Sequence, residues 1–267
     1  MSGNAGDTYP TWRFEGKVVI VTGAGSGIGA ACTRRFAEAG ALVAAVDLDG
    51  AAVAALARAD ARIHPFTANV GEAGAMDAVI ASVVERFGQL DILVNNAGIF
   101  RTAPFVETTD ETWAESIATN LTGVFYASRA AARAMLARGA GGRIVNVSSQ
   151  HAAVSEPNGS AYTATKAGVE GFTRTLASEL APAGITVNCV RPGATHSNLT
   201  APIFTREVLD ALLPRIPLGM IAEPDWIAQG ILFFASDAGR YATGTTLALD
   251  GGYIMDGSLA AGAAYGS

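Results

Sequence analysis

Tyr162 and Lys166 stand four residues apart in the segment A-Y-T-A-T-K-A-G, and Ser149 lies thirteen positions before Tyr162. A helix places residues i and i+4 on one face, so this spacing predicts that the ammonium of Lys166 lies beside the phenol of Tyr162. A neighbouring positive charge favours the phenolate and lowers the pKa of tyrosine from its ordinary value of about 10. Such a phenol can take a proton from an alcohol or return one to a ketone, while Ser149 hydrogen-bonds the same oxygen. Taken alone, the Tyr–Lys spacing also fits an ordinary surface helix.

A glycine-rich turn near the N-terminus predicts a binding site for phosphate groups. The apolar run 17–21 indicates a buried strand, the segment T-G-A-G-S-G-I-G follows it, and a helical stretch then leads to Gly40. Gly23 allows a tight turn, Gly27 lets the main chain approach a pyrophosphate, and Gly29 lets the helix pack closely against the strand. The start of that helix offers N–H groups and a positive dipole end to an anion. The expected dinucleotide contacts in this turn come from Gly23, Ser26, Gly27, Ile28 and Gly29.

Asp47 ends a second predicted strand, eighteen residues after Gly29, and is followed by Leu48. A carboxylate at this position suits the 2′- and 3′-hydroxyls of an adenosine ribose and repels a 2′-phosphate. No Arg or Lys stands between Arg35 and Arg58, so no cation nearby in the sequence would attract that phosphate. We therefore predict NAD rather than NADP as the cofactor, with Asp47 and Leu48 beside the adenosine. The alternative interpretation is a surface aspartate that begins a turn.

Together with several further markers, these motifs resemble the short-chain dehydrogenase/reductase family in its single-domain form. The glycine spacing T-G-x-x-x-G-x-G is typical of that family. The other markers, in chain order, are N-N-A-G at 95–98, Asn120 in T-N-L-T-G-V-F, Ser148-Ser149, P-G at 192–193 and D-G-G at 250–252. The resemblance extends over residues 14–256.

The resemblance implies a role for each member of a catalytic set. Tyr162 is expected to be the general acid and base, and Lys166 to lower the pKa of Tyr162 and to hydrogen-bond the nicotinamide ribose. Ser149 is expected to orient the substrate oxygen and to stabilise developing alkoxide charge. Asn120 is expected to hold a water in a proton relay to Lys166, through a local distortion of its helix.

The same resemblance implies further cofactor contacts beyond the glycine turn. They fall on Asn96, Ala97, Gly98, Pro192, Gly193 and Thr195. Two positions depart from the family pattern: Asn69-Val70 stands where Asp-Val is usual near the adenine, and Ser197 stands where a Thr often contacts the nicotinamide amide. A hydrogen-bonding group remains at each place, so we expect Asn69, Val70 and Ser197 to contact the cofactor as well.

Alternating strand and helix patterns predict an α/β fold, a single-domain doubly wound Rossmann fold with about seven parallel strands flanked by helices. We expect an N-terminal extension at 1–13, a catalytic domain at 14–256, and a C-terminal tail at 257–267 that packs at a subunit interface of a homotetramer. The predicted strands are 17–22, 42–47, 62–66, 91–95, 143–148, 185–191 and 245–249. The predicted helical stretches are 27–39, 72–87, 110–137, 160–181 and 224–236.

Composition narrows the classes of partner. A net charge of −6 and a pI of about 5.1 argue against nucleic acid or an anionic membrane as the main partner. The chain shows no apolar stretch of about 20 residues and no apolar signal core, so we expect a cytoplasmic protein with a small-molecule substrate. Cys32 and Cys189 are expected to be buried free thiols, and three isolated histidines argue against a metal site.

The substrate pocket supports two interpretations. His151 follows Ser149 by two residues, Glu156 and Asn158 lie in the loop before Tyr162, and these polar groups favour a polyol or sugar-like substrate. The segment S-Q-H resembles the S-V-H of bacterial glucose dehydrogenases in the same family. Phe100 and Phe204, with Val154, Ile203 and Met220, favour instead an apolar pocket for a cyclic or aryl ketone. Residues 194–223, which contain a short predicted helix at 203–213, are interpreted as a substrate lid.

Three functions remain open on the sequence. The first is an NAD-dependent secondary-alcohol dehydrogenase for a small polyhydroxylated or cyclic substrate. The second is a 3-oxoacyl-thioester (acyl carrier protein) reductase, which would prefer NADPH and a basic docking surface. The third is a non-catalytic dinucleotide-sensing protein on the same scaffold, a class that typically loses the Tyr or the Lys, whereas this chain keeps both.

Overall fold

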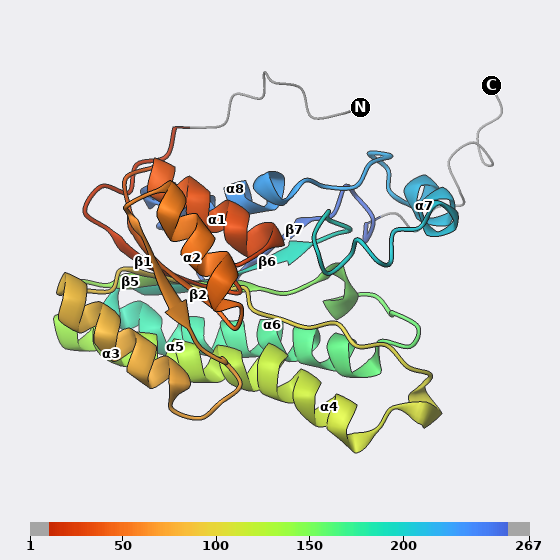
Figure 1. Ribbon diagram of the computed structural model, residues 1–267, viewed down its shortest axis with the longest axis horizontal. Helices are drawn as coiled ribbons and strands as arrows, with labels where there is room; N and C mark the ends of the chain where they lie inside the picture. Colours follow the sequence, from red (N-terminus) through yellow and green to blue (C-terminus); the bar gives the residue numbers. More distant parts are fainter. Residues whose placement is uncertain (1–10, 256–267) are drawn as a thin grey trace.

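The computed structural model describes residues 11–255, which form one seven-stranded sheet covered by helices on both faces (Figure 1). All neighbouring strands are parallel, in the order β3-β2-β1-β4-β5-β6-β7. The strands are β1 (Val18–Thr22), β2 (Leu42–Asp47), β3 (Ile63–Thr67), β4 (Ile92–Asn95), β5 (Gly142–Val147), β6 (Ile185–Pro192) and β7 (Thr246–Leu249). The predicted α/β Rossmann fold with seven parallel strands is therefore confirmed.

The two helical layers follow from the two-residue period of the buried strands. In β1, Val19 and Val21 pack into one apolar cluster and Val18 and Ile20 into the other, because successive side chains of a strand point to opposite faces. The first cluster is covered by α1 (Gly27–Glu38), α2 (Gly50–Ala59) and α8 (Pro224–Ala235), and the second by α3 (Ala75–Phe87), α5 (Gly123–Arg138) and α6 (Ser160–Leu180). In Figure 1 these groups of helices lie on opposite sides of the sheet.

The strand order creates the place where a ligand can bind. The chain runs from β1 outward to β2 and β3, then returns to β4 on the other side of β1 and continues to β7. The loops after β1 and β4 therefore diverge, and a crevice opens between them at the carboxyl ends of the strands. The residues that follow β1, β4, β5 and β6 are the ones that the sequence motifs single out.

The helix predictions need four corrections. Helix α2 was not predicted; it begins after Asp49, whose side chain accepts hydrogen bonds from Ala51 N and Ala52 N. Helix α3 begins at Ala75 rather than 72, after Gly74 in the left-handed conformation (φ 83°). The predicted helix 203–213 is shorter, α7 (Arg206–Leu212), capped by Thr205. The long predicted helix 110–137 is divided into α4 (Asp110–Ile117), a π-helical turn at Ala118–Thr122, and α5.

Several predictions concern the ends of the chain and its thiols. Cys32 and Cys189 are buried free thiols, as predicted. Trp12, which belongs to the predicted extension 1–13, donates a hydrogen bond from Nε1 to Gln229 Oε1 on α8 (2.6 Å). The predicted interface tail, 257–267, lies outside the described residues. Among residues 11–255, no helix is long and apolar enough to cross a membrane, and no group of three His, Cys, Asp or Glu side chains is placed to hold a metal ion.

Candidate active site

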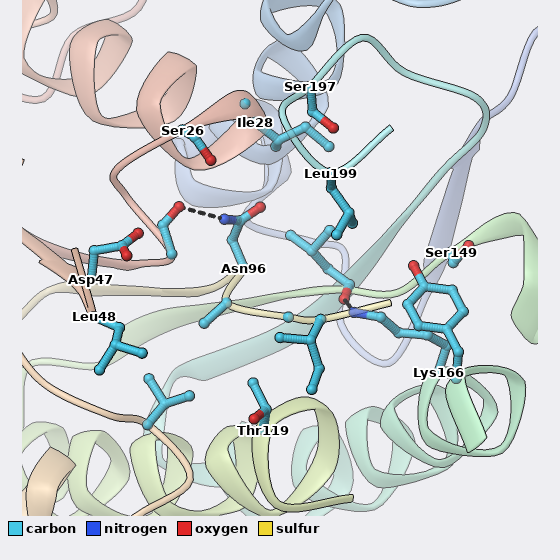
Figure 2. A pocket seen from close by; sticks show the side chains of 18 of the residues that line it. Ser26, Ile28, Asp47, Leu48, Asn96, Thr119, Ser149, Lys166, Ser197 and Leu199 are labelled. Carbon is cyan, nitrogen blue, oxygen red and sulfur yellow. Dashed lines mark hydrogen bonds between the residues drawn. The ribbon is translucent and has the colours of Figure 1, made fainter. Parts of the chain in front are cut away.

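A cavity of about 560 Å³ lies along the carboxyl ends of the strands, and most of the predicted site residues line it (Figure 2). Asp47 and Leu48 lie at one side of the view, and Ser149 and Lys166 at the other. The cavity is thus elongated. Binding of the adenosine ribose is predicted at the end with Asp47, and proton transfer at the end with Ser149 and Lys166. Predicted residues in its wall are Gly23, Ser26, Gly27, Ile28, Asp47, Leu48, Asn69, Val70, Asn96, Ala97, Gly98, Ser149, Tyr162, Lys166, Pro192, Gly193, Thr195 and Ser197.

The glycine turn is shaped for close approach of a ligand to the main chain. Gly23 has a φ of 65°, and a Cβ there would lie 2.7 Å from the Cα of Ala97. A Cβ on Gly29 would overlap the carbonyl oxygen of Gly23. Because glycine has no Cβ, the helix can start this close to the strand. Ser26 is the N-cap of α1, yet its side chain makes no capping hydrogen bond. Its hydroxyl and the first N–H groups of α1 therefore suit a pyrophosphate.

Asp47 is held rigidly at the end of β2. Its Oδ2 accepts a hydrogen bond from Gly25 N (2.8 Å), and its Oδ1 accepts one from Asp49 N (2.9 Å). Each carboxylate oxygen has two lone-pair directions, so one on each remains for a pair of ribose hydroxyls. Leu48 next to it is 71% exposed and forms part of the cavity wall.

Asn96 ties the end of β4 to the glycine turn. Its Nδ2 donates to the carbonyls of Thr22 (3.0 Å) and Gly23 (3.1 Å), and its N–H donates to Thr22 Oγ1 (3.1 Å). Ala97 N donates to the same hydroxyl (3.1 Å). These bonds fix the two walls of the crevice relative to one another; the bond from Asn96 to Gly23 is drawn in Figure 2.

Tyr162, Lys166 and Ser149 converge at the other end of the cavity. Lys166 Nζ lies 5.6 Å from the centre of the Tyr162 ring and donates a hydrogen bond to the carbonyl of Val147 (2.9 Å). Ser149 follows β5, and its Oγ accepts a hydrogen bond from His151 N (3.2 Å). Because that oxygen is used as an acceptor, its own O–H remains able to donate. All three side chains line the cavity, as the spacing predicts.

The electrostatics of Tyr162 differ from the prediction. Burial raises the pKa of Tyr162 above its ordinary value; the hydrogen bond with Ser149 lowers it in part, and the charge of Glu156 raises it further. Burial also lowers the pKa of Lys166 from 10.5 to about 8. The expectation that Lys166 depresses the tyrosine pKa is therefore wrong for the protein alone. The physical reason is that the buried ammonium loses its proton before the phenol ionises, so it offers no charge to the phenolate.

Asn120 lies in the π-helical turn, which confirms the predicted distortion of its helix. It is completely buried and does not belong to the cavity wall. Its Oδ1 accepts from Ile99 N (2.8 Å) and its Nδ2 donates to Ile99 O (2.9 Å), so the side chain holds the loop after β4. A Cβ on Gly98 would lie 3.3 Å from Asn120 Oδ1 and 3.5 Å from Lys166 Nζ, so a side chain there would pack tightly against Asn120.

Of the predicted substrate contacts, Ser149 alone belongs to the cavity wall. His151 and Glu156 face each other, with 3.2 Å between Nε2 and Oε2, beside the loop that leads to Tyr162. Burial lowers the pKa of His151, and the charge of Glu156 opposes this effect only in part. The lowered pKa favours a hydrogen bond between a neutral imidazole and the carboxylate.

The remaining predicted substrate residues take other places. Phe100 packs edge-on against Tyr162, with ring centroids 4.8 Å apart. The carbonyl of Asn158 accepts a hydrogen bond from Ala103 N (2.9 Å), and Phe204 packs against His196 instead of Tyr162, with centroids 6.2 Å apart. The structure thus brings Phe100 to the catalytic end and leaves Phe204 in the lid.

The predicted lid, 194–223, is anchored at its base and touches the glycine turn. A β-bridge joins Thr195 to Ala222, and Thr200 Oγ1 donates to Thr195 O (2.6 Å). Ser197 N donates to Thr200 Oγ1 (3.0 Å), and a Cβ on Gly27 would lie 3.0 Å from Ser197 Cβ. The segment from 195 to 200 therefore covers the cavity from the side of α1, as Figure 2 shows for Ser197 and Leu199.

Several wall residues were not predicted. They include Arg101, Glu115, Thr119, Leu199 and Thr200. Arg101 and Glu115 form a two-point ion pair (3.0 and 3.2 Å) that joins the loop after β4 to α4. Thr119 directly precedes the marker residue Asn120, and Leu199 and Thr200 belong to the predicted lid, so these three carried a sequence signal. Arg101 lies in the loop after β4 and Glu115 on α4, and no motif marked either as a wall residue.

Comparison with known proteins agrees with this geometry. Residues 23–254 match a family model described as enoyl-(acyl carrier protein) reductase. This chain is similar to a 3-oxoacyl-[acyl-carrier-protein] reductase of Thermotoga maritima, with 40% identity over 91% of this chain and 100% of the relative. It is also similar to a D-threitol dehydrogenase of Mycolicibacterium smegmatis, with 41% identity over 91% of this chain and 95% of the relative.

A solved structure has the same fold. A short-chain type dehydrogenase/reductase from Mycobacterium marinum matches with a TM-score of 0.87 and 32% identity, over 92% of this chain and 98% of the other. The correspondence covers nearly the whole of both chains, so the two proteins share the fold described above.

Proposed function

This chain belongs to the short-chain dehydrogenase/reductase family of oxidoreductases that act on hydroxyl groups, and on that premise we propose that it is an NAD-dependent dehydrogenase. It transfers a hydride between nicotinamide C4 and a secondary alcohol or ketone. The substrate is a small polyol or a sugar-like or cyclic alcohol. The observation that carries the proposal is the two-ended cavity, with the fixed Asp47 carboxylate at one end and Ser149, Tyr162 and Lys166 at the other.

The preference for NAD rests on the rigidity of Asp47. Two backbone N–H groups hold its carboxylate at the cavity wall, so the carboxylate cannot swing away to admit a 2′-phosphate. The basic side chains among the cavity-wall residues are Arg101 and Lys166. Arg101 is paired with Glu115, and Lys166 lies at the opposite end of Figure 2 from Asp47, so neither is available to a phosphate on the adenosine ribose.

The chain's own residues supply binding and proton transfer. When bound in the cavity, NAD would supply the hydride acceptor and a positive charge. Tyr162 takes the proton from the substrate hydroxyl, and Ser149 donates a hydrogen bond to the same oxygen as negative charge develops on it. Lys166 lies beneath the phenol and donates to a ribose hydroxyl with the N–H groups that Val147 leaves available. Asn120 is assigned the holding of a water in a proton relay to Lys166, which the π-helical distortion of its helix supports.

The polyol proposal rests on two independent points. The pair His151–Glu156 places an imidazole and a carboxylate near the catalytic tyrosine, and such groups bind neighbouring hydroxyls of a polyol. The similarity to a D-threitol dehydrogenase at 41% identity supports the same substrate class. Phe100, which packs edge-on against Tyr162, adds an apolar surface beside the catalytic group and favours a short or cyclic substrate.

A second candidate is reduction of 3-oxoacyl thioesters, which the similarity to the Thermotoga maritima reductase favours. The net charge of −6 gives little attraction for an acidic carrier protein, and Asp47 opposes NADPH, so we place this candidate second. We further propose a cytoplasmic homotetramer, in line with the apolar side chains exposed on α4 and α5, such as Trp113 and Phe125.

The test is a panel of substrates in which turnover is measured by the absorbance of NADH. Polyols, aldoses, cyclic alcohols and aryl alcohols are offered with NAD and with NADP, and a 3-oxoacyl thioester is offered with NADH and NADPH. We expect turnover of polyols with NAD, at a kcat/KM at least about tenfold above that with NADP. Turnover of the thioester with NADPH alone would replace the proposal with the second candidate.

A further inference from the structure

A buried ion pair lies directly behind the catalytic residues and connects three elements of the site. Glu170 is on α6, one helical turn after Lys166, and its side chain is 9% exposed. Arg191 is on β6, immediately before the Pro192-Gly193 turn. Arg191 Nε donates to Glu170 Oε1 (2.8 Å) and Nη2 donates to Oε2 (2.5 Å). Two parallel bonds to a buried carboxylate fix the relative orientation of both side chains as well as their distance.

Ser148 joins the third element to this pair. Its Oγ lies 2.9 Å from Glu170 Oε1 and 3.2 Å from the main-chain carbonyl of Lys166, so one hydroxyl proton is shared between two acceptors on α6. Its N–H donates to Val190 O (2.8 Å), which continues the register of β5 against β6. We call these three residues, Ser148, Glu170 and Arg191, the Glu170 network. Each lies next to a residue of the cavity wall or one helical turn from it: Ser149, Lys166 and Pro192, respectively.

We propose that the Glu170 network positions Ser149 and the Pro192-Gly193 turn relative to Tyr162 and Lys166. Each of its members is a positioning residue: Glu170 and Arg191 do not belong to the cavity wall, and Ser148, which does, directs its hydroxyl to α6. The proposal rests on the proposed dehydrogenase function. Its physical basis is that hydride and proton transfer require reacting groups held within fractions of an ångström, and a small displacement can cost a large part of the rate.

A purely structural role would be the simpler explanation of the same contacts. A buried ion pair often contributes little to stability, because desolvation of both charges offsets their attraction. The same chain offers a matched example, Arg138–Asp91 (2.9 Å), at the opposite edge of the sheet, with Asp91 buried like Glu170. Equal substitutions at the two arginines therefore separate positioning from stability.

The experiment compares Arg191→Lys with Arg138→Lys, and adds Ser148→Ala as a milder cut in the network. Lysine keeps the charge at both positions. Arg191→Lys loses the two-point contact with Glu170, whereas Arg138 contacts Asp91 through Nη1 alone, so Arg138→Lys is expected to lower the melting temperature no more than Arg191→Lys does. We expect Arg191→Lys to lower kcat about tenfold and Ser148→Ala about threefold, with KM for NAD within twofold. We expect Arg138→Lys to keep kcat within twofold.

A second readout does not depend on activity. Hydrogen–deuterium exchange of the main chain is expected to rise at 148–151 and 191–195 in Arg191→Lys and Ser148→Ala, and to stay unchanged in β2 and β3. Equal losses of kcat in Arg191→Lys and Arg138→Lys, or no local rise in exchange, would overturn the proposal. If the unaltered protein oxidises no alcohol and reduces no ketone, the proposed function fails, and the exchange pattern alone still decides whether the Glu170 network positions these segments.

Discussion

Two buried charges are paired in different ways, one at the amino edge of the sheet, where the strands begin, and one at the carboxyl edge, where they end. At the amino edge, the carboxylate of Asp91 accepts hydrogen bonds from Val18 N (2.9 Å), Gln89 Nε2 (2.8 Å) and Arg138 Nη1 (2.9 Å). At the carboxyl edge, Lys166 is as deeply buried, at 4% exposure. Its ammonium has three donors, and within the described part of the chain it uses one, toward Val147 O.

This difference separates the parts of the molecule that maintain the fold from those that bind. A fully paired buried charge anchors three chain segments and leaves nothing for a ligand. A buried ammonium with spare donors beside a cavity is unfavourable in the protein alone, and burial lowers the pKa of Lys166 accordingly. We infer that the carboxyl edge gives up stability so that a ribose hydroxyl and a reacting oxygen can bind there.

The largest expected effect is that of Tyr162→Phe. The ring still packs against Phe100, but the proton donor and acceptor is lost, so we expect kcat to fall by about 10³-fold or more. NADH affinity, followed by its fluorescence, should stay within about twofold. Equal losses of turnover and NADH affinity would contradict the role of Tyr162 as the general acid and base.

Lys166→Met and Arg138→Met test the contrast between the edges directly. The shift of the Lys166 pKa from 10.5 to about 8 implies that removing the charge stabilises the protein at pH 7 by about 2 kcal/mol, after loss of one hydrogen bond. Arg138→Met should destabilise by about 2 kcal/mol, because it removes a partner of buried Asp91, while kcat is retained. Turnover of Lys166→Met should fall about 100-fold or more. Denaturant unfolding and steady-state kinetics measure both quantities.

The same shift predicts a pH dependence of stability. Between about pH 8 and 10.5 the unfolded chain binds the Lys166 proton and the folded protein does not, so this group makes the free energy of unfolding rise with pH across that window. Lys166→Met should lack this contribution, and Arg138→Met should keep it. Parallel curves of unfolding free energy for the unaltered protein and Lys166→Met would show that the ammonium is not held in the way described.

Asp47→Ala tests the end of the cavity where we propose that the adenosine ribose binds. Loss of the carboxylate removes the repulsion of a 2′-phosphate, so the ratio of kcat/KM for NAD to that for NADP should fall about 10- to 100-fold. Melting temperature without cofactor should change little, since Gly25 and Asp49 lose only exposed or partly exposed hydrogen bonds. An unchanged ratio would remove the basis for NAD preference.

The smallest expected effect is that of His151→Ala. Loss of the imidazole that faces Glu156 should raise KM for a polyol about fivefold, with KM for NAD unchanged. The matched control is Phe204→Leu in the lid, which should leave KM for the polyol within twofold. A larger effect of Phe204→Leu than of His151→Ala would shift the pocket toward the apolar interpretation.

Local sequence patterns predicted the strands of the fold and the main residues of the site. The strands were predicted within one or two residues, because buried parallel strands read as short apolar runs. The glycine turn, Asp47 and the pair Tyr162–Lys166 were predicted because each motif is contained within one strand–turn–helix unit or one helical turn. Helix α2 was missed; among its residues only Val53 is buried.

Contacts between distant segments could not be predicted in the same way. The ring of Phe100 rests on Tyr162, 62 positions later, and Ser197 of the lid touches Gly27. Each of these pairs depends on where several loops cross, and loop paths follow no period of 2 or 3.6 residues. For that reason the place of Arg101, which lies in the loop after β4, in the cavity wall was not predicted.

The sequence by itself determined the order of the elements, the crevice beside β1 and the types of reactive group at its two ends. These properties follow from side-chain periodicity, glycine positions and the handedness of strand–helix–strand units. Only the tertiary structure decided the raised pKa of Tyr162, the lowered pKa of Lys166, and the meeting of Ser148, Glu170 and Arg191. Desolvation and two-point ion pairing depend on every segment that packs around a group, and therefore on the whole fold.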